Sequence, residues 1–196
     1  YKRQVPPCAE SCTDQMGIYP LKEAVCFDRD GVINQALVRR GHPYSPANLE
    51  QFTWVKGIHD VCEQLKSVGF VLICVTNQPD VGRGLQSHAV VEILHTKIMD
   101  ELPLESIYSC YHDGIEDCAC RKPKPGMLLQ AANEYGVDLT RSWLIGDRWK
   151  DVDAGNAAGC ETVFVDYGYD EELNTFPDHR VSDVREIPPV ILQARQ

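Results

Sequence analysis

The sequence predicts an α/β fold, a doubly wound and mainly parallel sheet with helices on both faces. Short, continuous apolar runs alternate with segments of helical periodicity, which is typical of parallel strands buried on both faces. Polar residues recur where the apolar runs stop, and in such a sheet these positions share one edge. The 196 residues suit one compact domain. We therefore expect an irregular extension over residues 1–20 and a single domain over residues 21–196.

The predicted elements follow one another in the order that this fold requires. The first strand spans residues 24–27, and the excursion over residues 31–56 is mostly irregular, with a size that suits a loop over a site. Further strands are expected over residues 70–75, 107–109, 142–145 and 162–165, with a short one near Arg180 and Val181. Helices are expected over residues 57–68, 87–101, 125–135 and 150–158. The tail from residue 168 is otherwise rich in loops.

Start and stop signals support the helices. After Gly57, apolar residues recur at three- and four-residue steps, which places them on one helix face. Ser87 can cap the second helix, because its hydroxyl can accept a hydrogen bond from an N–H of the first turn. Pro125 suits the first turn of the third helix, where no backbone hydrogen bond is lost. Gly69 and Gly136 stand where two of the helices end.

Composition argues against several classes of function. The net charge of −10 and the lack of a basic stripe argue against binding of a nucleic-acid backbone. No apolar stretch approaches the ~20 residues that a membrane span needs, and no signal peptide is visible. The nine cysteines are odd in number and several lie inside apolar runs, which favours reduced thiols over a disulfide framework. We expect a cytoplasmic monomer without nucleic-acid or membrane partners.

Charged and polar side chains gather at the predicted strand ends. These residues are Asp28, Asp30, Thr76, Asn77 and Asp147, with Arg121 and Lys122 before the third helix. Three carboxylates suit an oxygen-ligated cation, for which Mg²⁺ is the best match. A hydroxyl and an ammonium can hold a phosphoryl group, one carboxylate can attack phosphorus, and a second can move protons. The set predicts phosphoryl transfer through an aspartyl phosphate.

Several of these residues, and Asp151 after them, also have a simpler structural explanation. Thr76 and Asn77 could be turn residues, and Arg121 and Lys122 could be a solvated pair. Asp151 could merely favour a helix N-terminus through the helix dipole. Placement of polar residues at several strand ends at once favours the functional explanation.

A second cluster has the pattern Cys110-x-His112 followed by Cys118-x-Cys120. Three thiolates and one imidazole form a common tetrahedral zinc set. Four protein ligands leave no position for water, so this Zn²⁺ would be structural. It would order the zinc-binding loop, residues 110–120, whose end carries Arg121 and Lys122. The alternatives are reduced, unliganded thiols or a disulfide.

Four motifs carry a resemblance to a known family. F-D-R-D-G-V-I-N, V-T-N-Q, C-R-K-P-x-P-G-M and I-G-D-R-x-x-D occur in this order. The chain thereby resembles the haloacid dehalogenase (HAD) superfamily of phosphatases over about residues 22–167. More narrowly, it is similar to the D-glycero-D-manno-heptose 1,7-bisphosphate phosphatases and the related histidinol phosphatases. The heptose enzymes carry a similar cysteine loop, which here has only five residues between His112 and Cys118.

The resemblance implies a role for each motif position. Asp28 would be the nucleophile, and Asp30 the general acid and base that also binds Mg²⁺ through its backbone carbonyl. Thr76 and Lys122 would hold the phosphoryl group, and Asp147 would complete the Mg²⁺ site together with Asp28.

Other positions would contact the substrate or support the metal. Arg121 and Asn77 would contact the substrate, and Arg148 stands where the family often has a substrate-contacting lysine. Arg39 is the expected sugar contact in the loop after the first motif. Asp151 would support the metal or Lys122.

The resemblance also implies an activity. The chain lacks the inserts of large cap domains, so we expect a capless phosphatase in which the zinc-binding loop and residues 35–50 select the substrate. The expected substrate is D-glycero-D-manno-heptose 1,7-bisphosphate, which loses its 7-phosphate on the way to lipopolysaccharide or other surface glycans. Histidinol phosphate or another small phosphomonoester is the alternative. A zinc-stabilised binding module without activity and a receiver-like domain phosphorylated on Asp28 are alternatives of a different class, against which the intact set of acids and Lys122 argues.

Overall fold

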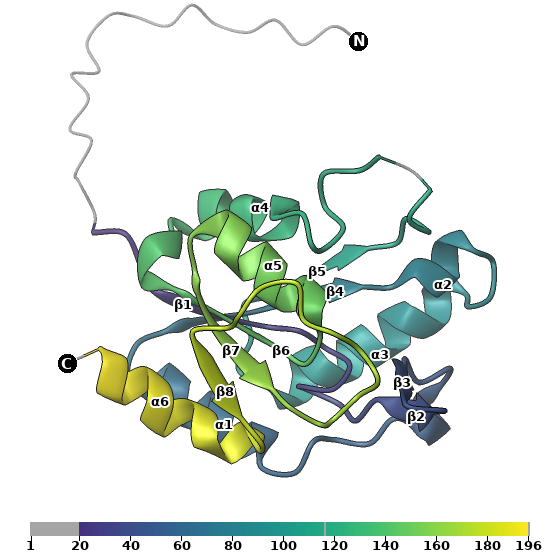
Figure 1. Cartoon of the computed structure of the whole chain (residues 1–196), viewed down its shortest axis with the longest axis horizontal. Coiled ribbons are helices and arrows are strands. Elements are labelled where there is room, and N and C mark those ends of the chain that lie inside the picture. The colour runs from purple at the N-terminus through teal and green to yellow at the C-terminus, as the bar shows by residue number, and fades with distance from the viewer. Residues whose placement is uncertain (1–19, 116, 196) are drawn as a thin grey trace, which may run out of the picture.

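The computed structural model describes residues 20–115 and 117–195 (Figure 1). Its main sheet has six parallel strands in the order β5-β4-β1-β6-β7-β8. The strands are β1 (Ala24–Phe27), β4 (Val71–Asn77), β5 (Ser106–Cys110), β6 (Trp143–Gly146), β7 (Glu161–Val165) and β8 (His179–Val181). The predicted parallel sheet is confirmed. Residues 1–19, and with them most of the expected N-terminal extension, lie outside the described residues.

Helices cover both faces of this sheet (Figure 1). On one face lie α1 (Ile58–Ser67), α3 (His88–Glu101) and α6 (Ile187–Ala194), and on the other lie α4 (Gly126–Tyr135) and α5 (Trp149–Ala158). Val25 and Phe27 pack in the core beneath α1 and α6, whereas Ala24 and Cys26 pack in the core beneath α4 and α5. Alternate side chains of a strand point to opposite faces, so one continuous apolar run fills two cores.

The four helices expected from the sequence are all present, with ends within a residue of those expected. The predicted cap is confirmed, because Ser87 Oγ accepts a hydrogen bond from the Val90 N–H at 3.2 Å. β4 begins one residue later and ends two residues later than expected. Thr76 and Asn77 belong to it because they pair with Ser109 and Cys110 of β5.

The excursion over residues 31–56 is more regular than expected. It contains an antiparallel hairpin, β2 (Leu37–Arg39) and β3 (His42–Tyr44), and a 3-10 turn, η1 (Leu49–Gln51). The two residues between β2 and β3, Arg40 and Gly41, have φ of 52° and 79°. Positive φ at both positions is the requirement of a tight two-residue hairpin turn.

The C-terminal tail also holds more structure than expected. The short strand near Arg180 is confirmed as β8, but the helix α6 was missed. Two prolines occupy its first turn, where they cost no backbone hydrogen bond, and Ile187 and Ile191 pack into the core of α1. Shorter elements are α2 (Pro79–Gly82), η2 (Leu139–Arg141) and η3 (Val184–Glu186). No helix in the described part of the chain is both long and apolar enough to cross a membrane.

The parallel register brings the ends of β1, β4 and β6 to one edge of the sheet. Phe27 pairs with Cys74 of β4 and with Ile145 of β6, and the Asp28 N–H donates to the Ile145 carbonyl at 2.8 Å. Side chains that follow these positions therefore emerge next to one another.

Candidate active site

A cavity of about 340 Å³ opens at this edge of the sheet. It is bounded by the end of β1, the hairpin, the end of β4, the segment before α4 and the start of α5. Its lining residues are Asp28, Asp30, His42, Pro43, Tyr44, Ser45, Asn77, Pro79, Asp80, Arg83, Arg121, Lys122, Arg148, Lys150 and Asp151. Charged side chains dominate this lining, as a phosphorylated ligand would require.

Lys122 lies at the floor of the cavity and is 3% exposed. Its Nζ lies 2.9 Å from Asp28 Oδ1 and 2.5 Å from Asp151 Oδ1, and it donates to the Val75 carbonyl at 2.7 Å. Burial lowers the pKa of Lys122, but the carboxylates of Asp151 and Asp28 outweigh it and raise the pKa above its usual range. Lys122 is therefore a fixed positive charge beside Asp28.

Asp28 follows β1 directly and is itself buried. Burial raises the pKa of Asp28 to about 6, an effect that the ammonium of Lys122 opposes and the carboxylate of Asp151 reinforces. The Arg29 N–H donates to Asp28 Oδ1 at 2.7 Å and fixes the side chain at the cavity floor. An additional positive charge in the cavity would favour the ionised form that a nucleophile needs.

Three carboxylates converge near this point. One oxygen each of Asp28, Asp147 and Asp151 lies within 4.8 Å of the others. Both oxygens of Asp147 are buried and have no hydrogen-bond partner among the described residues. Burial, and then the charges of Asp28 and Asp151, raise the pKa of Asp147 well above its ordinary value. When all three carboxylates are ionised, the one ammonium of Lys122 leaves two negative charges uncompensated, and this oxygen-only set fits Mg²⁺.

Gly31 makes the approach of Asp147 possible. Its φ of +99° is in a region that favours glycine, and a Cβ at this position would overlap Asp147 Oδ2. The glycine of the first motif is thus required both by the backbone turn and by the third carboxylate.

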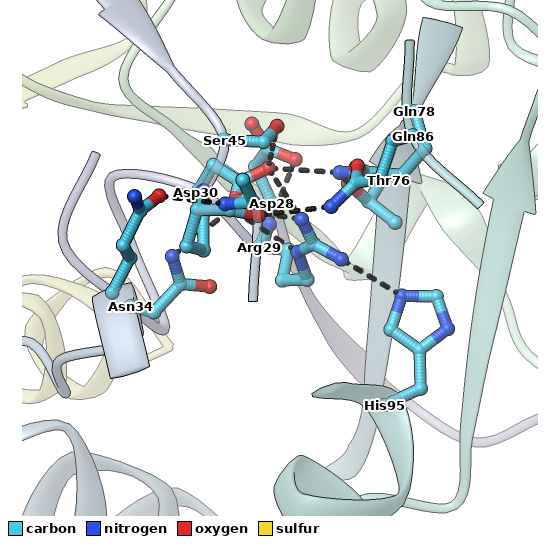
Figure 2. Close-up of polar contacts among 12 residues, drawn as sticks. Asp28, Arg29, Asp30, Asn34, Ser45, Thr76, Gln78, Gln86 and His95 are labelled. Atoms are coloured by element: carbon cyan, nitrogen blue, oxygen red, sulfur yellow. Dashed lines mark hydrogen bonds and ion pairs between the residues drawn. The ribbon is translucent and has the colours of Figure 1, made fainter. Parts of the chain in front are cut away.

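The carboxylate of Asp30 does not join this group but lies in a separate cradle of donors (Figure 2). Arg29 donates to both of its oxygens at 2.9–3.1 Å through Nε and Nη2. Asn34 donates at 2.9 Å, Ser45 at 2.7 Å and Gln78 at 2.8 Å. Burial raises the pKa of Asp30, but the charge of Arg29 and these hydrogen bonds outweigh burial and lower the pKa below its ordinary value.

The other residues singled out from the sequence take different positions. Thr76 is buried, and its Oγ1 accepts from Gln78 at 2.9 Å. Asn77 lines the cavity and exchanges two hydrogen bonds with the backbone of Lys122, at 2.9 and 3.1 Å, so it also positions that residue.

The predicted substrate-contacting arginines divide into two groups. Arg121 lines the cavity and donates to the His112 carbonyl at 3.0 Å, while Arg148 lines it and is paired with Glu171. Arg39 is absent from the lining, and its guanidinium lies over the ring of Tyr44, 5.6 Å from the ring centre. The hairpin contributes other residues to the cavity, His42 to Ser45.

Sequence reasoning missed several residues of this site. Ser45 and Gln78 hold Asp30, Lys150 lines the cavity, and Arg29 connects Asp30 to His95 of α3. Gln78 and Arg29 stand inside the motifs and could have been noticed there. The contacts of Ser45 and His95 are distant in sequence and leave no local pattern.

The cysteine cluster forms a second site beside the cavity. Ligand atoms of Cys110, His112, Cys118 and Cys120 all lie within 4.8 Å of one another. His112 Nδ1 is 3.3 Å from the sulfurs of both Cys110 and Cys120. Cys110 is the last residue of β5 and is buried, and the loop that follows returns to it before Arg121.

Comparison with known proteins places the chain in a family. A family model described as HAD-hydrolase-like matches residues 119–187. D-glycero-β-D-manno-heptose-1,7-bisphosphate 7-phosphatase of Yersinia pestis is 38% identical over 151 residues, which are 71% of this chain and 77% of that protein. The protein of the same name from Escherichia coli K12 is 36% identical over 152 residues, which are 71% of this chain and 76% of that protein.

Solved structures of HAD-like phosphatases have a similar fold. The D,D-heptose 1,7-bisphosphate phosphatase of B. bronchiseptica, crystallised with magnesium and phosphate, has a TM-score of 0.73 and 26% identity, with 88% of this chain and 99% of that chain covered. A HAD-like phosphatase from Mesorhizobium loti has a TM-score of 0.72 and 23% identity, covers 89% of this chain and 88% of its own, and shares the fold. The chain therefore belongs to the family of D-glycero-β-D-manno-heptose-1,7-bisphosphate 7-phosphatases among the HAD-like hydrolases.

Proposed function

We propose that this protein is a Mg²⁺-dependent phosphatase that removes the 7-phosphate of D-glycero-D-manno-heptose 1,7-bisphosphate through an aspartyl phosphate. The observation that supports this most is the convergence of Asp28, Asp147 and Asp151 beside Lys122, where all of these residues except Asp147 line one cavity. The names of the relatives support the choice of substrate.

The reaction follows from the chemistry of these side chains. A carboxylate oxygen of Asp28 attacks phosphorus while the bond between phosphorus and the sugar oxygen breaks, and Asp30, which must carry a proton for this step, gives that proton to the sugar oxygen. Asp30 then takes a proton from water, whose oxygen attacks the same phosphorus and releases phosphate and the free Asp28 carboxylate. Lys122 and Thr76 hold the oxygens of the phosphoryl group in both steps.

Asp28 and Asp147, with Asp151 close by and the backbone carbonyl of Asp30, would hold the Mg²⁺. Once bound, the cation would neutralise charge on the phosphoryl oxygens and on the buried carboxylates. The three acids bring too much negative charge for Lys122 alone, which supports this assignment.

A bisphosphate also presents a second phosphate, and the cavity wall carries cations for it. Arg121 and Lys150 line the cavity, and neither forms an ion pair with a carboxylate among the described residues. We assign the zinc-binding loop and the hairpin the task of selecting the substrate, in a single capless domain over residues 21–196.

The test is phosphate release with Mg²⁺ from the α- and β-heptose 1,7-bisphosphates and from histidinol phosphate, with the product phosphate located by NMR. We expect preference for a heptose bisphosphate, loss of phosphate only from carbon 7, and loss of activity with EDTA that Mg²⁺ restores. A clear preference for histidinol phosphate would overturn the substrate, and activity that survives EDTA would overturn the role of the metal.

We further propose that Cys110, His112, Cys118 and Cys120 bind one structural Zn²⁺. The convergence of their four ligand atoms to within 4.8 Å of one another supports this, because a bound metal explains why these side chains gather at one point of the loop. None of the seven cysteines among the described residues forms a disulfide, which agrees with a reducing compartment such as the cytoplasm.

Replacing Cys118 by serine is expected to reduce the bound zinc from about one ion per chain to a small fraction, and to lower the melting temperature and the activity together. Arg121 and Lys122 follow this loop directly and line the cavity, so disorder of the loop in the variant would displace them as well. Metal content is measured by atomic emission, with Cys160→Ser as the control, because Cys160 directly precedes β7 and Cys110 ends β5, which places them at opposite ends of the parallel strands. Full zinc content in Cys118→Ser would remove Cys118 from the ligand set.

A further inference from the structure

Arg29, which donates hydrogen bonds to Asp30, also contacts His95 through the other end of its guanidinium (Figure 2). Arg29 is fully buried, at 0% exposure. Its Nε and Nη2 donate to Asp30, and its Nη1 lies 3.1 Å from Nε2 of His95, which comes from α3. One guanidinium thus joins the two side chains. Because the group is planar and rigid, the contact of Nη1 with His95 also fixes the orientation of Nε and Nη2 toward Asp30.

The contact requires a neutral His95. Arginine only donates hydrogen bonds, so Nε2 must accept, and the ring proton lies on Nδ1. Burial and the charge of Arg29 lower the pKa of His95 to about 4, which keeps the ring neutral at physiological pH. The nearest acid on α3 is Glu92, whose Oε1 is 3.8 Å from His95 Nδ1 and accepts from the hydroxyl of Tyr111 at 2.8 Å.

A neutral acceptor suits this position better than a charged one. A carboxylate at position 95 would form a second ion pair with Arg29 and compete with Asp30 for the guanidinium. An imidazole accepts from one N–H of Arg29 Nη1 and leaves the positive charge to Asp30. The buried guanidinium is therefore directed at one carboxylate, the one that must reach the leaving oxygen.

We propose that His95 is a positioning residue for catalysis, which acts through Arg29 to hold the carboxylate of Asp30 at the orientation from which it serves the leaving group. The inference rests on the proposed function in one respect, namely that Asp30 delivers a proton to the leaving oxygen. His95 itself does not touch the substrate and is not among the residues that line the cavity.

The test compares leaving groups, because only a poor one needs the proton. The parameter kcat/KM reports the steps up to transfer of the phosphoryl group to Asp28. An alkoxide sugar oxygen leaves poorly without a proton from Asp30, whereas p-nitrophenolate leaves without help. We would measure kcat/KM with Mg²⁺ for heptose 1,7-bisphosphate and for p-nitrophenyl phosphate in His95→Leu, His95→Gln and the parent protein.

We expect His95→Leu to lower kcat/KM for the sugar phosphate by about tenfold or more, and for p-nitrophenyl phosphate by less than about twofold. His95→Gln keeps an acceptor and is expected to recover most of the loss. His88→Gln, an exposed histidine of the same helix, is the control and should change neither value. Melting temperatures establish folding, and His95→Met replaces His95→Leu if the latter does not fold.

An equal loss on both substrates, no loss in a folded variant without an acceptor, or a glutamine variant no better than leucine would each overturn the inference. If the proposed substrate is wrong, the parent protein would hydrolyse p-nitrophenyl phosphate but not the heptose bisphosphate, which is distinct from any effect of the His95 variants. The same comparison would then use histidinol phosphate, which is also an alkyl phosphate.

Discussion

Replacing Asp28 by asparagine is expected to lower kcat by at least about 1,000-fold. The amide has the size of the carboxylate but cannot form an acyl phosphate. Phosphate release is measured under saturating Mg²⁺ and substrate, and mass spectrometry of acid-quenched protein detects the phosphorylated chain in the parent but not in the variant. Turnover that survives in Asp28→Asn would mean that another residue is the nucleophile.

The same variant should not lose stability. Asp28 is one of three buried carboxylates that share one ammonium, and burial disfavours its ionised form. Without Mg²⁺, the free energy of unfolding of Asp28→Asn is therefore expected to equal or exceed that of the parent. Asp60→Asn, an exposed carboxylate of α1, is the control and should keep full activity. A large loss of stability in Asp28→Asn would show that its effect on kcat is not chemical.

Replacing Lys122 by methionine is expected to have the largest effect on stability. Its buried ammonium is the charge partner of Asp28 and Asp151, and both lose it at once. Removing one member of a buried ion pair costs about 3–5 kcal/mol, because the other charge stays buried without compensation. Urea unfolding without Mg²⁺ measures this loss, and activity should disappear as well because the phosphoryl group loses its cation.

A second substitution separates lost charge from lost packing. If uncompensated charge is the cause, Lys122→Met combined with Asp151→Asn should be more stable than Lys122→Met alone. Asp153→Asn is the matched control on the same helix, because its carboxylate pairs with Asn174 and Thr175 outside the cavity. Equal stability of the single and double variants would mean that Lys122 acts mainly through packing or through its bond to the Val75 carbonyl.

Much of the fold follows from local patterns. The run before Asp28 had to be a buried strand because it is apolar at every position, and the helices followed from periodicity and from capping residues such as Ser87. The missed elements have weaker local signals. The hairpin turn depends on Arg40, and arginine rarely adopts positive φ. The two prolines at the start of α6 argue locally against a helix, which forms because it packs on α1.

The amino-acid sequence alone predicts which residues could do the chemistry, because it places Asp28 and Asp147 at the ends of predicted parallel strands and Lys122 just before a predicted helix. The sequence does not establish which basic side chain pairs with which carboxylate. Tertiary structure assigns Lys122 to Asp28 and Asp151, leaves Asp147 unpartnered, and directs Arg29 at Asp30. These pairings depend on distances of a few ångströms between residues far apart in the chain, and His95, from α3, affects the site only through such a contact.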